Sequence, residues 1–145
     1  MDKDSPYLKS IIINRGSKSG IKKGMPVLDD NYLVGRVVET NYLSSRVLLL
    51  NDLNSRIPVV LNDENVQAIL TGEGKKNPKL DYLPEMYEPK ENINIFTSGK
   101  DGIFMQGIPV GKTLVENDSV EVKLFSDPNQ LSFVNVQLIE LKKEF

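Results

Sequence analysis

The chain of 145 residues contains no histidine, no cysteine and no tryptophan. The lack of histidine excludes a Ser-His-Asp or Cys-His catalytic site, and it removes the usual general base near neutral pH. The lack of both histidine and cysteine excludes a zinc site built on imidazole or thiolate ligands. Catalysis would therefore need a pair of carboxylates, a lysine or a bound cofactor.

Long hydrophobic runs and a strong excess of one charge are also missing. No run of apolar residues reaches the roughly 18 that a membrane-spanning helix needs. The first residues, Met1 to Pro6, are polar and unlike a signal peptide. The 18 basic and 20 acidic residues nearly balance, and the lysines are scattered instead of forming a stripe. We therefore expect no membrane span within this sequence and no nucleic acid among its partners.

The composition is that of a small folded protein. Hydrophobic residues make up 39% of the chain and charged residues 26%, which suits one domain or two very small ones. Nearly every apolar stretch is short, rich in β-branched residues and bounded by turn residues, which predicts an all-β fold. Residues 40–53 contain enough leucine for a helix, but 46–52 is more typical of a buried strand that leads into a turn. The predicted strands are 7–13, 32–39, 46–50, 57–61, 67–71, 80–83, 93–97, 108–115, 119–125 and 131–139.

The motif Gly-x-Pro-Val occurs twice, at residues 24–27 and 107–110. Each copy follows a Gly-Ile pair and precedes a glycine with a basic neighbour, Gly35-Arg36 in the first copy and Gly111-Lys112 in the second. Because proline cannot donate a ladder hydrogen bond, it fits an edge or the first residue of a strand. The flanking glycines allow the positive φ that tight turns and bulges need. The repeat therefore predicts two related corner units, and with them two small β-domains.

Several polar segments have a superficial likeness to reactive or binding sites. Residues 97–102 lack both the nucleophile-elbow and the Walker pattern, so a glycine-built turn is the better interpretation. Residues 29–31 and 62–65 are acidic but lack the spacing of a calcium loop, and we interpret them as hairpin turns. Three arginines recur every ten residues, and they either cover the rim of the core with their stems or share an anion site. They are Arg36, Arg46 and Arg56.

Two apolar segments lie among turn residues and are candidate partner-binding sites. Ile103, Phe104 and Met105 lie in a glycine-rich segment, where they either plug the end of a barrel or present a contact surface. Met86 and Tyr87 lie in a polar, proline-bearing loop and form a second candidate contact. The sequence offers no candidate catalytic, cofactor-binding or metal-binding residue.

A series of short motifs follows in a specific order along the chain. They are Ile12-Ile13-Asn14-Arg15-Gly16, Gly20-Ile21-Lys22-Lys23-Gly24-Met25-Pro26-Val27, Leu33-Val34-Gly35-Arg36-Val37, Val47-Leu48-Leu49-Leu50-Asn51-Asp52, Arg56-Ile57-Pro58-Val59, Thr97-Ser98-Gly99 and Gly107-Ile108-Pro109-Val110-Gly111. This order resembles the extracytoplasmic region of the MreC family of bacterial rod-shape-determining proteins, over nearly all of residues 8–140. The family usually has glycine at the position of Asp101, proline at that of Met105 and Gly-Asp at Asn92-Ile93, so the loop 92–105 departs from the family pattern.

The resemblance implies two six-stranded β-barrels in a chymotrypsin-like arrangement without catalytic residues. It places residues 8–53 and 118–145 in the first barrel and residues 54–117 in a second, inserted barrel. Residues 1–7 would be the start of an expressed fragment or the end of a coiled coil. The resemblance also implies an N-terminal membrane helix, absent from this sequence, that anchors the protein on the extracytoplasmic (periplasmic) side of the cytoplasmic membrane.

The function that the resemblance implies is non-enzymatic and needs no cofactor. It is that of a scaffold of the cell-wall elongation machinery, which maintains cell shape by binding and regulating the class B penicillin-binding transpeptidase. Other implied partners are further membrane proteins of the rod complex, such as MreD, and the protein itself as a dimer or filament. The alternatives are a degenerate double-barrel hydrolase, which would need a base that the chain lacks, and a glycan-binding β module.

Overall fold

The computed structural model describes residues 9–62, 65–100, 106–117, 119–127 and 135–136. Within these ranges the chain forms β-strands and one short 3-10 turn, η1 (Ser17–Ser19), so the all-β prediction is confirmed. The strands are β1 (Ser10–Ile13), β2 (Pro26–Asp29), β3 (Tyr32–Thr40), β4 (Ser45–Leu49), β5 (Arg56–Leu61), β6 (Val66–Thr71), β7 (Lys79–Asp81), β8 (Asn94–Thr97), β9 (Pro109–Glu116), β10 (Ser119–Leu124) and β11 (Asn135–Val136).

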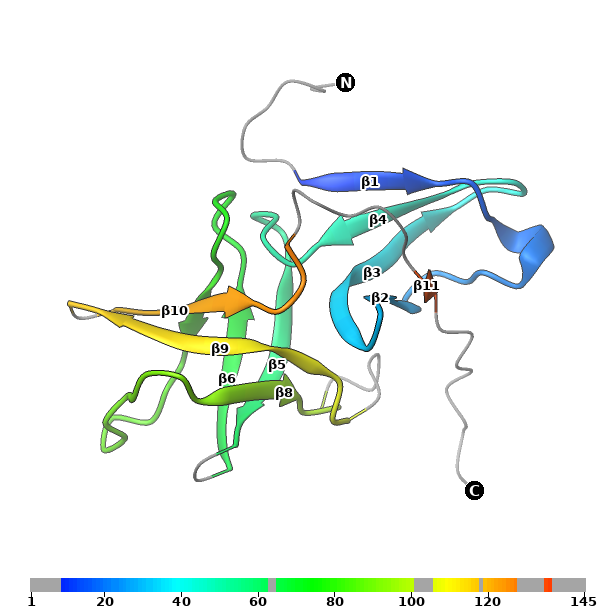
Figure 1. The fold of residues 1–145 in the computed structure, drawn as a ribbon. Helices are drawn as coiled ribbons and strands as arrows, with labels where there is room; N and C mark the ends of the chain where they lie inside the picture. Colours follow the sequence, from blue (N-terminus) through cyan, green and yellow to red (C-terminus); the bar gives the residue numbers. More distant parts are fainter. Residues whose placement is uncertain (1–8, 63–64, 101–105, 118, 128–134, 137–145) are drawn as a thin grey trace.

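The strands form two antiparallel units, which lie side by side in Figure 1. One unit is a closed barrel with the strand order β10-β7-β6-β5-β8-β9. The other is a five-stranded sheet with the order β1-β4-β3-β2-β11. The closed barrel leaves none of its six strands with an open edge, whereas β1 lies at one edge of the five-stranded sheet.

The topology differs from the expected division of the chain at β10. We expected residues 118–145 in the first barrel, but β10 is a strand of the closed barrel. The reason is local, because Asn117 takes a left-handed conformation at φ 53° and closes a tight turn that keeps β10 beside β9. The other edge of β10 then pairs with β7, through Glu121 and Lys79, and closes the ring. In the described part of the chain, the first unit is accordingly a five-stranded sheet and not a six-stranded barrel.

Most predicted strands are present, and the differences have physical causes. β2 was not predicted as a strand of its own, because its four residues follow a glycine-rich turn and run directly into the next hairpin. The strand predicted at residues 80–83 ends at Asp81, because Tyr82 takes a left-handed conformation at φ 65°. The predicted buried strand within residues 40–53 is confirmed as β4.

The two Gly-x-Pro-Val copies form equivalent corners. Pro26 and Pro109 are the first residues of β2 and β9, as the sequence predicts. The preceding glycines have positive φ, 97° at Gly24 and 90° at Gly107. Each corner makes the same two backbone hydrogen bonds with its neighbouring strand, so the prediction of related corner units is confirmed. The bonds run from Gly24 N to Val37 O (2.7 Å) and Val37 N to Met25 O (2.9 Å), and from Gly107 N to Thr97 O (2.9 Å) and Thr97 N to Ile108 O (3.0 Å).

The five-stranded sheet buries one face along its length and the other at the β2–β3 hairpin. One face packs its apolar side chains into a small core of its own, with Val27, Val37 and Val47 fully buried. At the β2–β3 hairpin and just after β4, the other face contributes to the core of the closed barrel. Leu28, Leu33 and Leu50 come from the first unit and belong to the same cluster as the barrel core residues, among them Ile57, Val59, Leu61, Leu70, Ile95, Val110 and Val122. The two units therefore share the larger of the two hydrophobic clusters.

Candidate functional site

Among the described residues, the exposed large apolar side chains include two neighbouring pairs, while Ile12, Tyr32 and Leu53 are exposed singly. The two most exposed, Tyr82 at 82% and Met86 at 94%, follow β7 on the closed barrel. Tyr42 and Leu43 are each 64% exposed and form the loop between β3 and β4. Isolated apolar side chains are normal on a protein surface, but neighbouring pairs at loop tips are typical of contact surfaces.

The first surface depends on how residues 82–87 leave the barrel. Leu83 and Tyr87 pack against the barrel core, and the Tyr87 amide donates to the carbonyl of Pro84 at 3.1 Å. This turn holds the segment against the barrel, while Tyr82 and Met86 face solvent. A tyrosine at positive φ is unusual, since its Cβ crowds the backbone there, and such residues cluster at functional sites.

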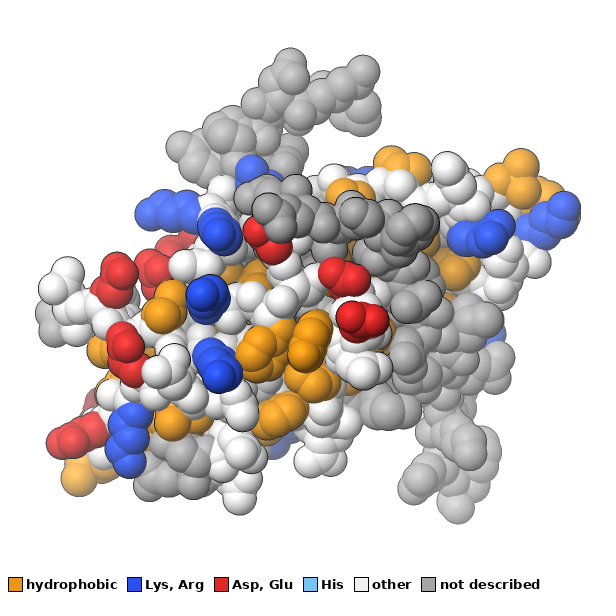
Figure 2. Space-filling view, in the orientation of Figure 1, with side chains coloured by type: hydrophobic (Ala, Val, Ile, Leu, Met, Phe, Trp, Pro, Cys, Tyr) orange, Lys and Arg blue, Asp and Glu red, His pale blue; other side chains and the backbone are white. Residues whose placement is uncertain are grey.

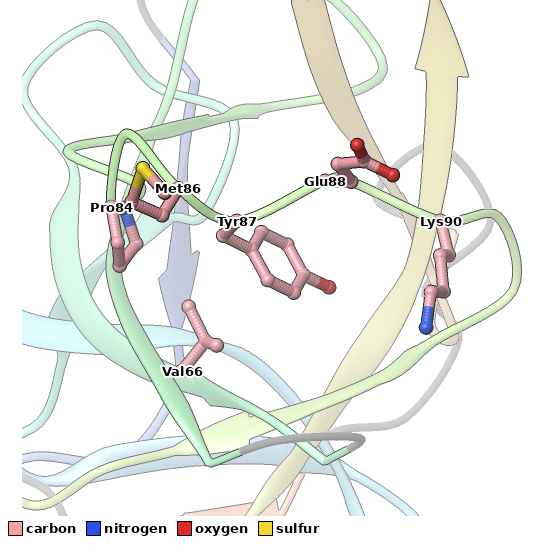
Figure 3. Close-up of a pocket in the computed structure, with 6 residues that line it drawn as sticks. All are labelled: Val66, Pro84, Met86, Tyr87, Glu88 and Lys90. Atoms are coloured by element: carbon pink, nitrogen blue, oxygen red, sulfur yellow. The ribbon is translucent and has the colours of Figure 1, made fainter.

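An open pocket of about 450 Å³ lies beside this segment. Figure 3 shows the Tyr87 ring above Val66, with Pro84 and Met86 on one side and Lys90 on the other. Glu88 completes the lining. The pocket offers apolar walls with one amine and one carboxylate at the rim, a combination that suits the side chain of a protein partner better than a chemical reaction.

The second surface surrounds a smaller pocket of about 260 Å³ at the tip of the β3–β4 hairpin. No carboxylate is among its lining residues, whereas Arg15 and Lys18 both line it. The Lys18 amine lies 5.9 Å from the centroid of the Tyr42 ring, a cation–π arrangement. The complete lining is Asn14, Arg15, Gly16, Lys18, Ser19, Tyr42 and Leu43.

Backbone contacts hold this tip in place. The amides of Ser17 and Lys18 donate to the carbonyls of Asn41 and Tyr42, at 2.8 and 3.0 Å. The close approach needs glycine at position 16, because a Cβ there would lie 2.1 Å from the Asn41 carbonyl oxygen. Tyr42 and Leu43 are thus exposed on a braced loop instead of a free one.

Of the five partner-binding residues predicted from the sequence, two lie in the described part of the structure and three do not. Met86 is exposed and Tyr87 is half-buried beside it. Ile103, Phe104 and Met105 lie outside the described residues. Sequence analysis missed Tyr42, Leu43 and Tyr82. The signal for Tyr42 and Leu43 was an apolar pair between Asn41 and two serines, a turn-like setting that we included in the longer helix candidate at residues 40–53.

The polar segments at residues 29–31 and 97–100 contain turns, whereas residues 63–64 and 101–102 lie outside the described residues. Asp30 lies in the β2–β3 hairpin turn at φ 57°, and Gly99 turns the chain after β8 at φ 75°. The Ser98 hydroxyl accepts a bond from the Lys100 amide within this turn (3.3 Å). Two of the three arginines have separate partners, since Arg46 pairs with Glu39 at 3.5 Å and Arg56 donates to the carbonyl of Leu53. Among the described residues no group of three acidic side chains is placed to hold a metal ion.

A closed antiparallel barrel joined to a five-stranded sheet defines a class of small β-barrel proteins. Residues 1–137 match the family model described as the barrel core of the rod shape-determining protein MreC. The chain therefore belongs to the MreC family, and the resemblance found in the sequence is confirmed.

Curated relatives agree with this assignment. The cell shape-determining protein MreC of Caulobacter vibrioides is 40% identical over 140 residues, which cover 96% of this chain and 40% of that protein. The protein of the same name from Cereibacter sphaeroides is 35% identical over 138 residues, which cover 93% of this chain and 45% of that protein. The chain thus spans less than half the length of these two relatives.

Solved structures share the fold. MreC from Pseudomonas aeruginosa superposes with a TM-score of 0.84 at 29% identity, over 93% of this chain and 92% of that one. A complex between penicillin-binding protein PBP2 and MreC from Helicobacter pylori matches with a TM-score of 0.66 at 18% identity, over 86% of this chain and 80% of that one. No helix among the described residues is both long and apolar enough to cross a membrane.

Proposed function

We propose that this protein is a non-enzymatic scaffold of the cell-wall elongation machinery, which binds and regulates a class B penicillin-binding transpeptidase. It acts on the extracytoplasmic side of the cytoplasmic membrane, where an N-terminal helix beyond this sequence anchors it. It associates with itself and with other membrane proteins of the rod complex such as MreD. We also keep as a proposal that the five-stranded sheet completes a second barrel in a chymotrypsin-like arrangement.

The observation that carries this proposal is the exposed segment around Met86 on a rigid closed barrel. A scaffold needs a persistent surface and no chemistry, and an unbranched apolar side chain beside a pocket is a typical contact point. Membership of a family named for cell shape, and a solved complex of a PBP2 with an MreC of similar fold, support a transpeptidase as the partner. No observation favours the hydrolase or the glycan-binding alternative.

The test is a titration of this chain with the soluble ectodomain of its cognate transpeptidase. We expect saturable binding, and we expect Met86→Ala to weaken it about 5- to 30-fold, the effect of roughly 1–2 kcal/mol at a central contact. Ile12→Ala is the control, because it removes an exposed apolar side chain from β1, on the other unit. Absence of saturable binding by the folded chain would contradict the proposal, and so would equal losses in both variants.

The same titration tests residues 103–105 as a contact. Phe104→Ala is expected to weaken binding while the far-UV circular dichroism spectrum and the melting temperature stay unchanged. Loss of folding in this variant would instead assign Phe104 to the core as a barrel plug and would remove it from the contact surface.

A further inference from the structure

We propose that one end of the molecule, the basic tip, docks on a membrane surface that contains anionic phospholipid. The basic tip is defined as residues 14–19 with 41–44. Its cations bind the phosphates of the lipid headgroups, and its exposed apolar pair enters the boundary between headgroups and acyl chains. This inference rests on the extracytoplasmic location proposed above, which places the chain beside a membrane. It depends on the charge of the tip, its exposed apolar side chains and the contacts that brace them.

Positive charge is concentrated in one part of the chain. Residues 9–28 contain five basic side chains and no acidic one, whereas residues 29–145 contain 12 basic and 18 acidic side chains. Four of the five basic side chains lie between β1 and β2, and all four are exposed: Arg15, Lys18, Lys22 and Lys23. The near balance of charge over the whole chain hides this asymmetry, which attracts an anionic surface to one end of the molecule.

Carboxylates are scarce around the tip. None lines its pocket of about 260 Å³, whereas Arg15 and Lys18 both do. Glu39 is the acidic residue nearest in sequence to the β3–β4 turn, and its charge is paired with Arg46 at 3.5 Å. Figure 2 shows blue and orange side chains together at the upper right of the molecule, with no red side chain in view there. The positive charge of the tip is therefore available to an anionic partner.

Tyr42 and Leu43 supply the apolar part of the tip. Each is 64% exposed, in the turn between β3 and β4. A tyrosine suits the membrane interface, because its apolar ring and polar hydroxyl match the boundary between acyl chains and headgroups. The Lys18 amine, 5.9 Å from the centroid of the Tyr42 ring, lies where a headgroup phosphate would meet it. Apolar side chains beside cations are the combination by which proteins bind anionic membranes at their surface.

The fold braces the tip, so that docking does not first have to order it. Besides the two backbone bonds described above, the Thr40 and Ser45 hydroxyls share a hydrogen bond of 2.9 Å below the turn. The Ser45 hydroxyl also donates to the Arg15 carbonyl at 2.7 Å. These contacts join the turn with the apolar pair to the segment with the cations. A preorganised surface of this kind loses little conformational entropy on binding.

The size of the tip favours a membrane over a folded protein as its partner. Seven residues line the tip pocket. A stable protein interface usually takes about 20–30 residues from each partner. A membrane contact needs fewer when a helix already anchors the protein, because the anchor keeps the local concentration of tip and membrane high.

Docking through the tip would orient the closed barrel. Figure 1 shows the β3–β4 turn at one end of the molecule and the connection from β7 to β8 at the other. Residues 82–91 of that connection contain three carboxylates and one lysine. An anionic membrane repels this end while it attracts the tip. Met86 would then face away from the membrane, where the transpeptidase ectodomain can reach it.

Flotation of this chain with lipid vesicles tests the inference. The vesicles contain either phosphatidylglycerol mixed with phosphatidylcholine or phosphatidylcholine alone. We expect saturable binding to the anionic vesicles, at least tenfold weaker binding to the neutral ones and a loss of binding as salt is added. Excess inorganic phosphate, compared with chloride at equal ionic strength, should compete weakly, because a free ion offers no apolar layer to the tip.

Paired substitutions of cations locate the contact. Arg15→Gln with Lys18→Gln should weaken binding to the anionic vesicles about 10- to 30-fold, since each cation near such a surface contributes roughly fivefold in affinity. The matched control is Lys112→Gln with Lys123→Gln. It removes the same charge from two exposed lysines that are cross-strand partners on β9 and β10 of the closed barrel, and it should change binding less than about threefold.

A second pair of substitutions tests the apolar part. Tyr42→Ser with Leu43→Ser should weaken vesicle binding about tenfold and keep the preference for anionic lipid, because the cations remain. Met86→Ser is the matched control, since it removes an exposed apolar side chain from the other end of the molecule. It should leave vesicle binding unchanged. Unchanged melting temperatures show that all variants are folded.

Four results would overturn the inference. They are no binding to anionic vesicles, equal binding to neutral ones, equal losses in the tip and barrel lysine variants, and full displacement by inorganic phosphate. Binding of the tip to a polyglutamate peptide, but not to vesicles, would assign it to an acidic protein partner instead. The tip variants should still bind the transpeptidase ectodomain. A chain that binds the ectodomain but no vesicle would refute the membrane contact and leave the transpeptidase proposal standing.

Discussion

At the scale of single residues, glycine meets two different needs in the Gly-x-Pro-Val repeat. Gly107 turns the chain at φ 90°, and a Cβ there would meet open space. Gly111 supports close packing, because a Cβ there would lie 2.4 Å from the Lys123 carbonyl oxygen and 2.8 Å from a Val122 methyl group. Gly35, its counterpart in the first copy, is crowded in the same way by the Leu48 carbonyl.

We therefore expect Gly111→Ala to destabilise the protein more than Gly107→Ala does. The first substitution forces backbone apart in the barrel wall and should cost about 2–3 kcal/mol of unfolding free energy. The second strains only the local conformation and should cost about 1–2 kcal/mol. Urea denaturation of both variants measures the difference. A larger loss in Gly107→Ala would contradict the assigned roles.

Single residues also show which structural features the sequence predicts and which it does not. Pro26 and Pro109 were placed correctly, because the missing N–H restricts proline whatever surrounds it. Tyr82 was placed wrongly, because its apolar side chain fitted the strand predicted at residues 80–83. Its left-handed conformation and its exposure follow from the packing of the chain on either side of it.

At the scale of elements, the connection between β4 and β5 joins the two units through a buried carboxylate. Asp52 is 1% exposed. Its Oδ2 accepts a bond from the Lys9 amide at 2.6 Å, and its Oδ1 accepts one from the Asn54 amide at 2.7 Å. The link therefore joins the start of β1 to the turn that leads into the barrel. A second link, from the Ser126 hydroxyl to an Asp29 carboxylate oxygen at 2.9 Å, joins the end of β10 to β2.

Removal of the Asp52 carboxylate should loosen this connection. Asp52→Ala leaves two amides without their acceptor and should cost about 2–4 kcal/mol, since hydrogen bonds to a charged group contribute about 1.5–3 kcal/mol each. Asp52→Asn should cost less, because its one amide oxygen can still accept a bond. Thermal melting together with hydrogen exchange at Lys9 and Asn54 measures both effects. Equal stability of the alanine variant and the unaltered protein would refute the role of this link.

At the scale of the whole molecule, the shared core makes the two units one folding unit. Leu33 belongs to the five-stranded sheet, yet it is fully buried in the cluster that fills the closed barrel. A cavity at this position removes contacts from both units at once. The arrangement differs from two domains joined by a linker, in which each core would respond alone.

Leu33→Ala should therefore destabilise the closed barrel as well as the sheet. We expect a loss of about 2–5 kcal/mol and a single unfolding transition. Hydrogen exchange should show faster exchange in β5 and β6 as well as in β3. Two separate transitions, with the barrel amides protected as before, would show that the units fold independently.

The sequence by itself determined the all-β class, the proline-led corners and the absence of histidine and cysteine chemistry. It also identified the family, because these properties depend on residue types and short spacings. Only the tertiary structure decided that β10 closes the barrel, that the two units share a core and that Met86 and the Tyr42–Leu43 tip are exposed at opposite ends. The physical reason is that burial, strand partners and exposure depend on contacts between residues far apart in the chain, such as β7 with β10 or Lys9 with Asp52. Local pattern does not encode those contacts.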